Sequence, residues 1–357
     1  MEERIERLRE KIDRLDEQLV RLLNERVRLA LEIAEVKSRL NAPVYAPHRE
    51  REVIERVLKL NRGPIPPQAL EAIFREIISA ARALEKPLRI AFLGPPGSFG
   101  HEASMKQFGR SVEYLPVQTQ PDVFREVEIG RADYGVVAIE NSISGSVAET
   151  LDMFLHTDLK ICAEVMIPIH HHLLAKCRFE EIKRIYSHPQ ALAQCRGWLD
   201  KHMKDVPRIP VSSTSEGASM AAKEEGAAAI ASRLAAEVYG LNVVREHIED
   251  QSGNTTRFLV IGKHYAKRSG YDKTSFIFSV RDEPGALMRA LERFYKHGLN
   301  LTKLESRPYP GRRWEYVFFA DVEGHIDDEP MRKAAQELKE VCLLVKFLGS
   351  YPRAREV

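Results

Sequence analysis

The first forty residues carry an apolar repeat that suits only a long helix. Apolar side chains recur at alternating steps of three and four from Ile5 to Leu40, which places them along one face of an α-helix. A helix of about forty residues spans roughly 60 Å, about twice the width of a small domain. Two shorter helices of the same chain cannot cover so long a stripe. We therefore expect it to pack against a second copy of the chain.

One position of this stripe carries a positive charge. Arg26 stands between Leu22 and Leu29, where the repeat calls for an apolar residue, and Arg9 and Lys37 point in nearly the same direction. Arg26 and Lys37 lie roughly 16 Å apart along the axis, so both can hold one small dianion, whereas Arg9 is roughly 25 Å from Arg26. Arg9 can join them only from the partner helix of an antiparallel pair. A lone arginine usually snorkels or sets register, but three aligned cations followed by "HRERE" favour an anion site.

Three segments differ in periodicity and mark three predicted domains. Residues 1–86 are helical, with breaks at "NAP" and "NRGPIPP". Residues 88–265 alternate short β-rich runs with helical stretches, which is typical of an α/β sheet domain. After a polar linker, residues 274–357 follow the order βαββαβ, which predicts a ferredoxin-like unit.

Composition excludes several classes of protein. Lys plus Arg (54) nearly equals Asp plus Glu (52), so no net field indicates nucleic acid or a membrane as a partner. No apolar run is long enough to span a bilayer, and the first thirty residues form a charged helix rather than a signal peptide. Four cysteines without a CxxC pair are typical of free thiols in a reducing compartment. We expect a soluble cytoplasmic protein.

The helical segment resembles a known enzyme family. "LREKIDRLDEQLVRLLNERVRLALEIAEVK", followed by "PVYAPHRE", is similar to the all-helical chorismate mutases, intertwined dimers that rearrange chorismate to prephenate. The resemblance implies that Arg26, Arg49 and the partner chain's Arg9 bind the two carboxylates of chorismate. It also implies that Lys37 hydrogen-bonds the ether oxygen and that Glu50 binds the ring hydroxyl. A pericyclic shift needs no nucleophile, only a fixed conformer and stabilised charge.

Two positions depart from the pattern of that family. Ala46 stands where some members carry Asp. Glu85 stands where some members carry Gln as a second donor to the ether oxygen, and a glutamate donates there only when it is protonated. We therefore expect Glu85 to be a catalytic residue, and we expect mutase activity to be higher at mildly acid pH.

Polar residues gather beside the ends of predicted strands in the central segment. They lie in "FLGPPGSFGHEA", "DYGVVAIENSISGSV", "YSHPQALAQCRGWL" and "SGNTTRFLVIG". Glycine-rich turns aim backbone N–H groups at anions, and ligands of open α/β sheets bind at strand ends.

Together these four stretches resemble prephenate dehydratase, whose fold is two α/β lobes like a periplasmic binding protein, with the site in the cleft. The resemblance implies that Thr256 is catalytic and assists departure of the ring hydroxyl as water while the ring carboxylate leaves as CO₂. Arg257 is either a carboxylate anchor or a structural ion-pair partner, and Glu140 is either a second acid or an organiser of its loop. The expected binding residues are Gly97, Ser98, Asn141, Ser142, Ser187 and Gln190.

Histidines offer weaker signals. We expect His101 and His188 to make local hydrogen bonds. Beside His101, Gly100 replaces a hydroxyl residue that is common in the first dehydratase motif. "IPIHHHLL" suggests a metal site, but adjacent residues of a strand point to opposite faces, so three successive histidines cannot easily meet at one ion. A structural role is favoured there, and no metal or cofactor is implied.

The C-terminal segment is similar to the ACT regulatory domain of prephenate dehydratases through "PGAL" and "ESRP". The resemblance implies that two such domains pair and bind L-phenylalanine at their interface. The alternative is a dimerisation module that binds nothing. The implied effector residues are Gly285, Ala286, Leu287, Asn300, Leu301, Glu305, Ser306, Arg307 and Pro308.

From end to end the chain resembles a bifunctional chorismate mutase–prephenate dehydratase inhibited by phenylalanine. Its implied ligands are chorismate, prephenate and L-phenylalanine, and its implied state is a homodimer or a tetramer. Two other interpretations stay open: an arogenate dehydratase, and an amino-acid sensor without lyase chemistry.

Overall fold

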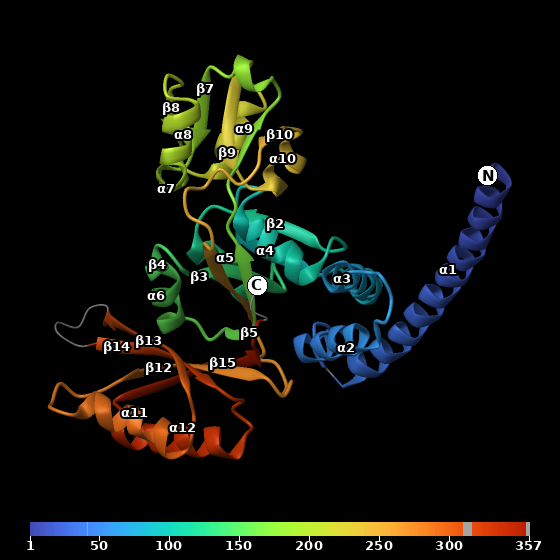
Figure 1. The fold of residues 1–357 in the computed structure, drawn as a ribbon. Coiled ribbons are helices and arrows are strands. Elements are labelled where there is room, and N and C mark those ends of the chain that lie inside the picture. Colours follow the sequence, from blue (N-terminus) through green and yellow to red (C-terminus); the bar gives the residue numbers. More distant parts are fainter. Residues whose placement is uncertain (41, 310–315, 355–357) are drawn as a thin grey trace. The chain divides into compact units, whose positions relative to one another are not determined.

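The computed structural model describes residues 1–40, 42–309 and 316–354 (Figure 1). The chain forms two compact units, which are described separately. The first holds residues 1–88 together with 108–112, and the second holds 89–107 and the chain from residue 113 onward. Within the described residues, no helix combines the length and apolar character needed to cross a membrane.

The first unit is helical. Its elements are α1 (Glu2–Arg39), α2 (Pro47–Leu60) and α3 (Pro67–Glu85), drawn in blue in Figure 1. Helices α2 and α3 both begin with proline, whose fixed φ suits a first turn. Helix α3 packs against both α2 and α1.

The apolar stripe of α1 stays largely exposed within one chain. Ten residues of the repeat, from Ile5 to Leu40, have exposed fractions between 50% and 72%. Ala34, on another side of the helix, is buried. The expected second copy of the chain therefore remains a prediction, and the stripe is available for it.

The second unit contains two α/β lobes. The first lobe has a sheet in the order β2-β1-β3-β11-β5, with β4 paired to β3. Its strands are β1 (Arg89–Leu93), β2 (Glu113–Val117), β3 (Tyr134–Asn141), β4 (Gly145–Ser146), β5 (Lys160–Pro168) and β11 (Thr255–Gly262), and its helices are α4 (Phe99–Phe108), α5 (Gln120–Glu128) and α6 (Ala148–His156).

The second lobe has a sheet in the order β10-β6-β9-β7-β8. Its strands are β6 (His172–Ala175), β7 (Arg184–Ser187), β8 (Arg208–Pro210), β9 (Ala227–Ala231) and β10 (Asn242–Arg245), and its helices are η1 (Phe179–Glu181), α7 (Pro189–Gln194), α8 (Arg196–His202), α9 (Thr214–Ala221) and α10 (Arg233–Tyr239). The chain crosses between the two sheets twice, from β5 to β6 and from β10 to β11 (Figure 1). The predicted two-lobed architecture is confirmed.

The remainder of the second unit is the predicted βαββαβ domain, coloured orange to red in Figure 1. Its sheet has the antiparallel order β13-β14-β12-β15. Its elements are β12 (Asp272–Ser279), α11 (Ala286–Lys296), β13 (Leu301–Pro308), β14 (Tyr316–Glu323), α12 (Glu329–Val341) and β15 (Leu344–Pro352).

Strand β12 is buried on both faces, which ties this domain to the first lobe. Phe276 and Phe278 point to one face and pack with residues of α11 and α12. Ile277 points to the other and joins a core cluster with Leu151 and Phe154 of α6. Because successive side chains of a strand alternate between faces, one strand supplies both cores.

Candidate functional sites

In the helical unit, four of the predicted mutase residues form two electrostatic groups, Arg26 with Arg49 and Glu50 with Lys37. Burial lowers the pKa of Arg26, and the positive charges of Arg56 and Arg49 lower it further. Burial raises the pKa of Glu50, while the charges of Arg82, Arg75 and Lys37 oppose that rise. Such mutual influence falls off with distance.

The individual contacts of these residues differ. The Lys37 ammonium lies 3.5 Å from the carbonyl oxygen of Val44, and Arg49 pairs with Glu52 at 2.8 Å on the outside of α2. Arg9 is exposed and lies 3.6 Å from the carboxylate of Glu6.

Two further predicted positions complete this unit. Glu85 ends α3 and is partly exposed, and Ala46 is the N-cap of α2 without a side-chain cap. Neither geometry assigns a role to its residue.

Sequence reasoning missed Arg82, a buried cation of α3 that pairs with Glu50. Its side chain is 5% exposed and donates to Glu50 Oε1 at 2.5 Å. Its second guanidinium nitrogen donates to the carbonyl of Phe108 at 2.7 Å. The guanidinium carbon lies 5.4 Å from the ring centroids of both Tyr45 and Phe108, within cation–π range. The sequence does offer a signal for Arg82. It stands four residues after Ile78, which places a cation on the apolar face of α3.

In the second unit, a cleft of about 240 Å³ is lined by both lobes. Asn141 and Thr256, predicted by sequence, are contributed by the first lobe, and His188 and Gln190 by the second. The lining residues are Phe99, Asn141, Ser144, Ile169, His171, His188, Gln190, Ala191, Gln194, Ser212, Ser213, Thr214, Asn254 and Thr256.

Thr256 and Asn141 face each other across the antiparallel pair β3–β11. The Asn141 amide donates to Thr256 Oγ1 at 2.8 Å and to Asn254 Oδ1 at 2.6 Å. Its carbonyl oxygen accepts from the backbone N–H groups of Ile143 and Ser144, both at 3.0 Å. Because Thr256 Oγ1 accepts this bond, its O–H proton is left to donate elsewhere.

Other predicted dehydratase residues make structural hydrogen bonds and are not among the residues that line the cleft. Ser187 is fully buried and donates to the carbonyl of Ile230 at 2.6 Å. Ser98 donates to the carbonyl of Leu93 at 2.8 Å. Ser142 Oγ accepts from the backbone N–H of Thr255 at 2.9 Å.

Gly97 also belongs to the framework beside the cleft. It has a φ of +84°, and its carbonyl accepts from Ser232 of the second lobe at 2.8 Å. A Cβ there would meet Ala235 Cα at 2.9 Å, so glycine fits both the turn and the close approach.

The predicted local bonds of His101 and His188 are confirmed. His101 Nδ1 accepts from the N–H of Gly97 at 3.1 Å, and its ring stacks on Phe92. His188 Nδ1 accepts from the N–H of Gln190 at 3.3 Å.

Arg257 has the geometry of a structural ion-pair partner. The side chain is 4% exposed and donates to Glu164 at 2.7 Å, to Asp321 at 2.6 Å and to the Tyr351 hydroxyl at 3.0 Å. Glu140 lies 3.8 Å from the same guanidinium. The charges of these acids outweigh burial and raise the pKa of Arg257. Asp321 and Tyr351 belong to the βαββαβ domain, so Arg257 joins it to the strand that carries Thr256.

Glu140 is further occupied by a salt bridge with Lys303 of β13. Lys303 also lies 3.0 Å from the carboxylate of Glu305. This geometry corresponds to the loop-organising role for Glu140.

His171 is a cleft residue that the sequence argument did not single out. It is 3% exposed, and its Nε2 lies 2.7 Å from Gln194 Oε1. Its ring stands edge-on to Phe99, with centroids 6.0 Å apart. Burial lowers the pKa of His171, so the imidazole is neutral near pH 7.

The predicted effector residues divide into two groups. Gly285 has a φ of +79° and precedes α11, and Ala286 is buried. On β13, Glu305 bonds to Ser146 and Arg307 bonds to both oxygens of Asp152 at 3.0 Å, so both face the first lobe.

The remaining effector residues lie along β13 or just before it. Ser306 and Pro308 stay exposed, and Leu301 is partly buried. The Asn300 carbonyl accepts from the N–H of Glu323 at 2.9 Å.

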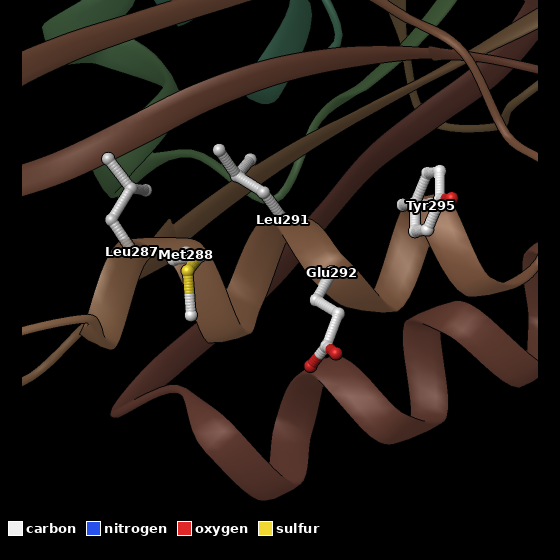
Figure 2. Close-up of a pocket in the computed structure, with 5 residues that line it drawn as sticks. All are labelled: Leu287, Met288, Leu291, Glu292 and Tyr295. Atoms are coloured by element: carbon white, nitrogen blue, oxygen red, sulfur yellow. The ribbon is translucent and has the colours of Figure 1, made fainter.

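A shallow apolar hollow runs along α11 (Figure 2). Met288 and Tyr295 are strongly exposed there, and Leu287 is its one predicted effector residue. The five lining residues are Leu287, Met288, Leu291, Glu292 and Tyr295.

A helical unit with clustered cations, a two-lobed unit with a polar cleft and an attached βαββαβ domain define a multidomain enzyme with a regulatory module. Comparisons with known families agree. Residues 8–86 match chorismate mutase type II, 90–266 match prephenate dehydratase and 274–340 match the ACT domain. A bifunctional chorismate mutase/prephenate dehydratase of Aquifex aeolicus is 52% identical over 330 residues, 91% of each chain. The chain belongs to the bifunctional chorismate mutase/prephenate dehydratase family.

Solved structures resemble the second unit. A prephenate dehydratase from Arthrobacter aurescens in complex with L-Phe has 36% identity and a TM-score of 0.69, covering 74% of this chain and 90% of that one. GqqA, described as a novel type of quorum-quenching acylase, has 32% identity and a TM-score of 0.68, covering 74% and 98%. Proteins with this fold are thus described with two different activities. The residues of the site, and not the fold alone, therefore indicate the reaction.

Proposed function

We propose that the chain catalyses two consecutive steps of phenylalanine biosynthesis. The helical unit rearranges chorismate to prephenate, and the two-lobed unit converts prephenate to phenylpyruvate, CO₂ and water. The observation that carries the second step is the Asn141–Thr256 pair in the cleft. Membership in the bifunctional family supports both steps.

In the mutase step, cations hold chorismate in its reactive conformer. Arg26 and Arg49, with Arg9 of a second chain, bind the carboxylates. Lys37 stabilises the charge that develops on the ether oxygen, and Glu50 accepts a hydrogen bond from the ring hydroxyl. Orientation and electrostatic stabilisation are the effects on which a pericyclic reaction can draw.

Two α3 residues complete the proposed mutase site. Arg82 opposes the rise in the pKa of Glu50 and orients its carboxylate, which its 2.5 Å hydrogen bond supports. Glu85 is the second donor to the ether oxygen in its protonated form.

In the dehydratase step, Thr256 donates its hydroxyl proton toward the leaving ring hydroxyl. The carboxylate leaves as CO₂, its bonding electrons enter the ring, the C–O bond breaks to release water, and Thr256 Oγ1 regains its proton from solvent. Asn141 orients Thr256, and Gln190 binds substrate from the second lobe. Because aromatisation drives the reaction, modest acid assistance suffices.

Assembly and regulation form the last part of the proposal. The exposed stripe of α1 supports pairing of two chains, and this pairing would supply Arg9. The ACT domain supports feedback inhibition by L-phenylalanine in a homodimer or tetramer. Four free cysteines support a cytoplasmic location.

The decisive test measures phenylpyruvate release by the purified protein from chorismate and from prephenate, each with and without phenylalanine. We expect product from both substrates and suppression by phenylalanine. Product from prephenate alone would limit the helical unit to dimerisation, with Ala46 and Glu85 as the first suspects. No product from either would favour an amino-acid sensor. Arogenate, assayed beside prephenate, tests the remaining alternative, since faster turnover of arogenate would reassign the substrate.

A further inference from the structure

Three side chains of types that can ligate a metal meet where the chain crosses between the lobes. His170 lies on the crossover from β5 to β6, and His247 and Glu249 lie on the crossover from β10 to β11. His170 Nδ1 is 2.8 Å from Glu249 Oε1 and 3.0 Å from His247 Nδ1. His247 Nδ1 is 3.5 Å from the same carboxylate oxygen.

These three atoms form a triangle of the size that a small cation needs. Sides of 2.8, 3.0 and 3.5 Å give a circumscribed circle with a radius of about 1.8 Å, slightly below the Zn–N distance of about 2.0–2.1 Å. An ion equidistant from all three would therefore sit about 0.9 Å out of their plane. A tetrahedral ion lies on one side of its three-ligand plane in the same way, with the fourth position open.

Hydrogen bonding alone satisfies this triangle poorly. If both imidazoles are neutral, a proton on His170 Nδ1 can serve Glu249 or His247, which leaves the lone pair of His247 Nδ1 facing a carboxylate oxygen. A proton on His247 instead meets that oxygen at 3.5 Å, beyond a good N–H···O distance. A cation equidistant from the three atoms is attracted by a lone pair of each of them.

A neighbouring backbone group orients the carboxylate of Glu249. Glu249 Oε2 accepts from the N–H of His171 at 2.9 Å, so its Oε1 is turned toward the histidines. The N–H of His247 points at His172 Nδ1 at 3.3 Å, and His247 adopts a φ of +51°. Hydrogen bonds that fix ligand orientation in this manner are typical around bound metals.

Exposure provides an entry path. The Glu249 side chain is 8% exposed, whereas those of His170 and His247 are 40% and 54% exposed. An ion can therefore reach the imidazoles from solvent and keep a water as its fourth ligand.

We propose that His170, His247 and Glu249 bind one transition-metal dication of the Zn²⁺ class. Two imidazole nitrogens and one carboxylate oxygen suit Zn²⁺, whereas Mg²⁺ and Ca²⁺ prefer oxygen ligands only. Of the three successive histidines, His170 belongs to this cluster, whereas His171 Nε2 lies beside Gln194 Oε1 and His172 Nδ1 accepts from the backbone N–H of His247. The partners of His170 instead lie 77 and 79 residues further along the chain.

This site would act on the hinge between the lobes. The bound ion fastens the two crossovers to each other, and Glu249 also holds the backbone of His171. His171 lines the cleft and bonds to Gln194 of the second lobe. Occupancy therefore stiffens the crossovers between the lobes through three residues that are not among those lining the cleft, which goes beyond the two proposed reactions.

The test titrates Zn²⁺ into the chelator-stripped full-length protein, with heat of binding and thermal unfolding as readouts. Four proteins are compared: the native chain, His247→Gln, Glu249→Gln and the control His264→Ala. His264 is exposed and lies outside the cluster, so its variant removes one surface imidazole only. Turnover of prephenate checks that every variant is folded.

We expect one Zn²⁺ per chain and a raised unfolding temperature for the native and His264→Ala proteins. Loss of one ligand should weaken binding by at least about tenfold in His247→Gln and Glu249→Gln, and Mg²⁺ should give no response. Binding of native strength in both ligand variants would overturn the proposal. So would the absence of saturable binding by the native protein at millimolar zinc.

Discussion

The pair Arg82–Glu50 offers the sharpest test of how the helical unit works. Arg82→Met keeps most of the side-chain volume and removes the charge that meets Glu50 at 2.5 Å. The Glu50 side chain is 17% exposed, so little water can replace the lost partner. We expect the variant to lose mutase activity while prephenate turnover is retained, because Arg82 and the residues that line the cleft belong to different units of the chain.

The size of the loss follows from the type of bond. A hydrogen bond between charged groups contributes about 1.5–3 kcal/mol, and about 1.4 kcal/mol corresponds to a factor of ten in rate. If orientation of Glu50 is needed in the transition state, kcat/KM for chorismate should fall roughly ten- to hundredfold. Arg82→Lys keeps the positive charge but lacks the forked guanidinium, so it should retain part of the kcat/KM that Arg82→Met loses.

The defect should also depend on pH. Burial raises the pKa of Glu50, and the charges of Arg82, Arg75 and Lys37 oppose that rise. Removing Arg82 therefore raises this pKa further, so a larger fraction of Glu50 is protonated as the pH falls and cannot accept the ring hydroxyl. The ratio of native to variant rates should grow from weakly alkaline to weakly acid pH.

Two comparisons make this prediction refutable. Arg75→Met removes another arginine of α3, which pairs with Glu71 at 2.7 Å, and should shift the pH profile less. Glu50→Gln tests the role of Glu50 itself. Native mutase rates across the pH range in Arg82→Met, together with a defect in Glu50→Gln, would refute the coupling and leave the role of Glu50 intact.

Four other predictions concern the cleft, the buried ion pairs of Arg257, the apolar stripe of α1 and the effector residues. Thr256→Val should lower prephenate turnover by about 10²–10⁴-fold while chorismate is still consumed, so that prephenate accumulates in product assays; native turnover would remove Thr256 from the mechanism. Arg257→Met removes the buried cation that Glu164 and Asp321 share, leaving Lys273 beside Glu164 and the Ser275 hydroxyl beside Asp321, and should lower the free energy of unfolding by about 3–5 kcal/mol; a raised KM with native stability in urea would instead support a carboxylate anchor. Leu19→Glu places a charge in the exposed stripe of α1 and should give monomers with dehydratase but no mutase activity, and sedimentation of a fully active dimer would contradict this. Gly285→Val, at a φ of +79°, and Ser306→Ala should relieve phenylalanine inhibition and spare uninhibited turnover; unchanged inhibition in both would argue that phenylalanine competes in the cleft.

Local sequence patterns predicted the elements and their order. The three–four repeat predicted α1, and the alternation of residues 274–357 predicted the βαββαβ order, because both patterns depend on neighbours along the chain. Motifs at strand and helix ends also identified Asn141, Gln190 and Thr256, which line one cleft. These residues could be found because strand ends of an α/β sheet are common ligand sites.

The sequence by itself therefore determined the family, the architecture and the residue types available for two reactions. Only the tertiary structure decided which side chains are partners. Arg82 meets Glu50 across 32 residues, Arg257 meets Asp321 across 64, and His170 meets His247 across 77. A periodic pattern reports which face a residue occupies, but a hydrogen bond or ion pair depends on positions within a few tenths of an ångström. Those positions are set by the packing of elements that are distant in the chain.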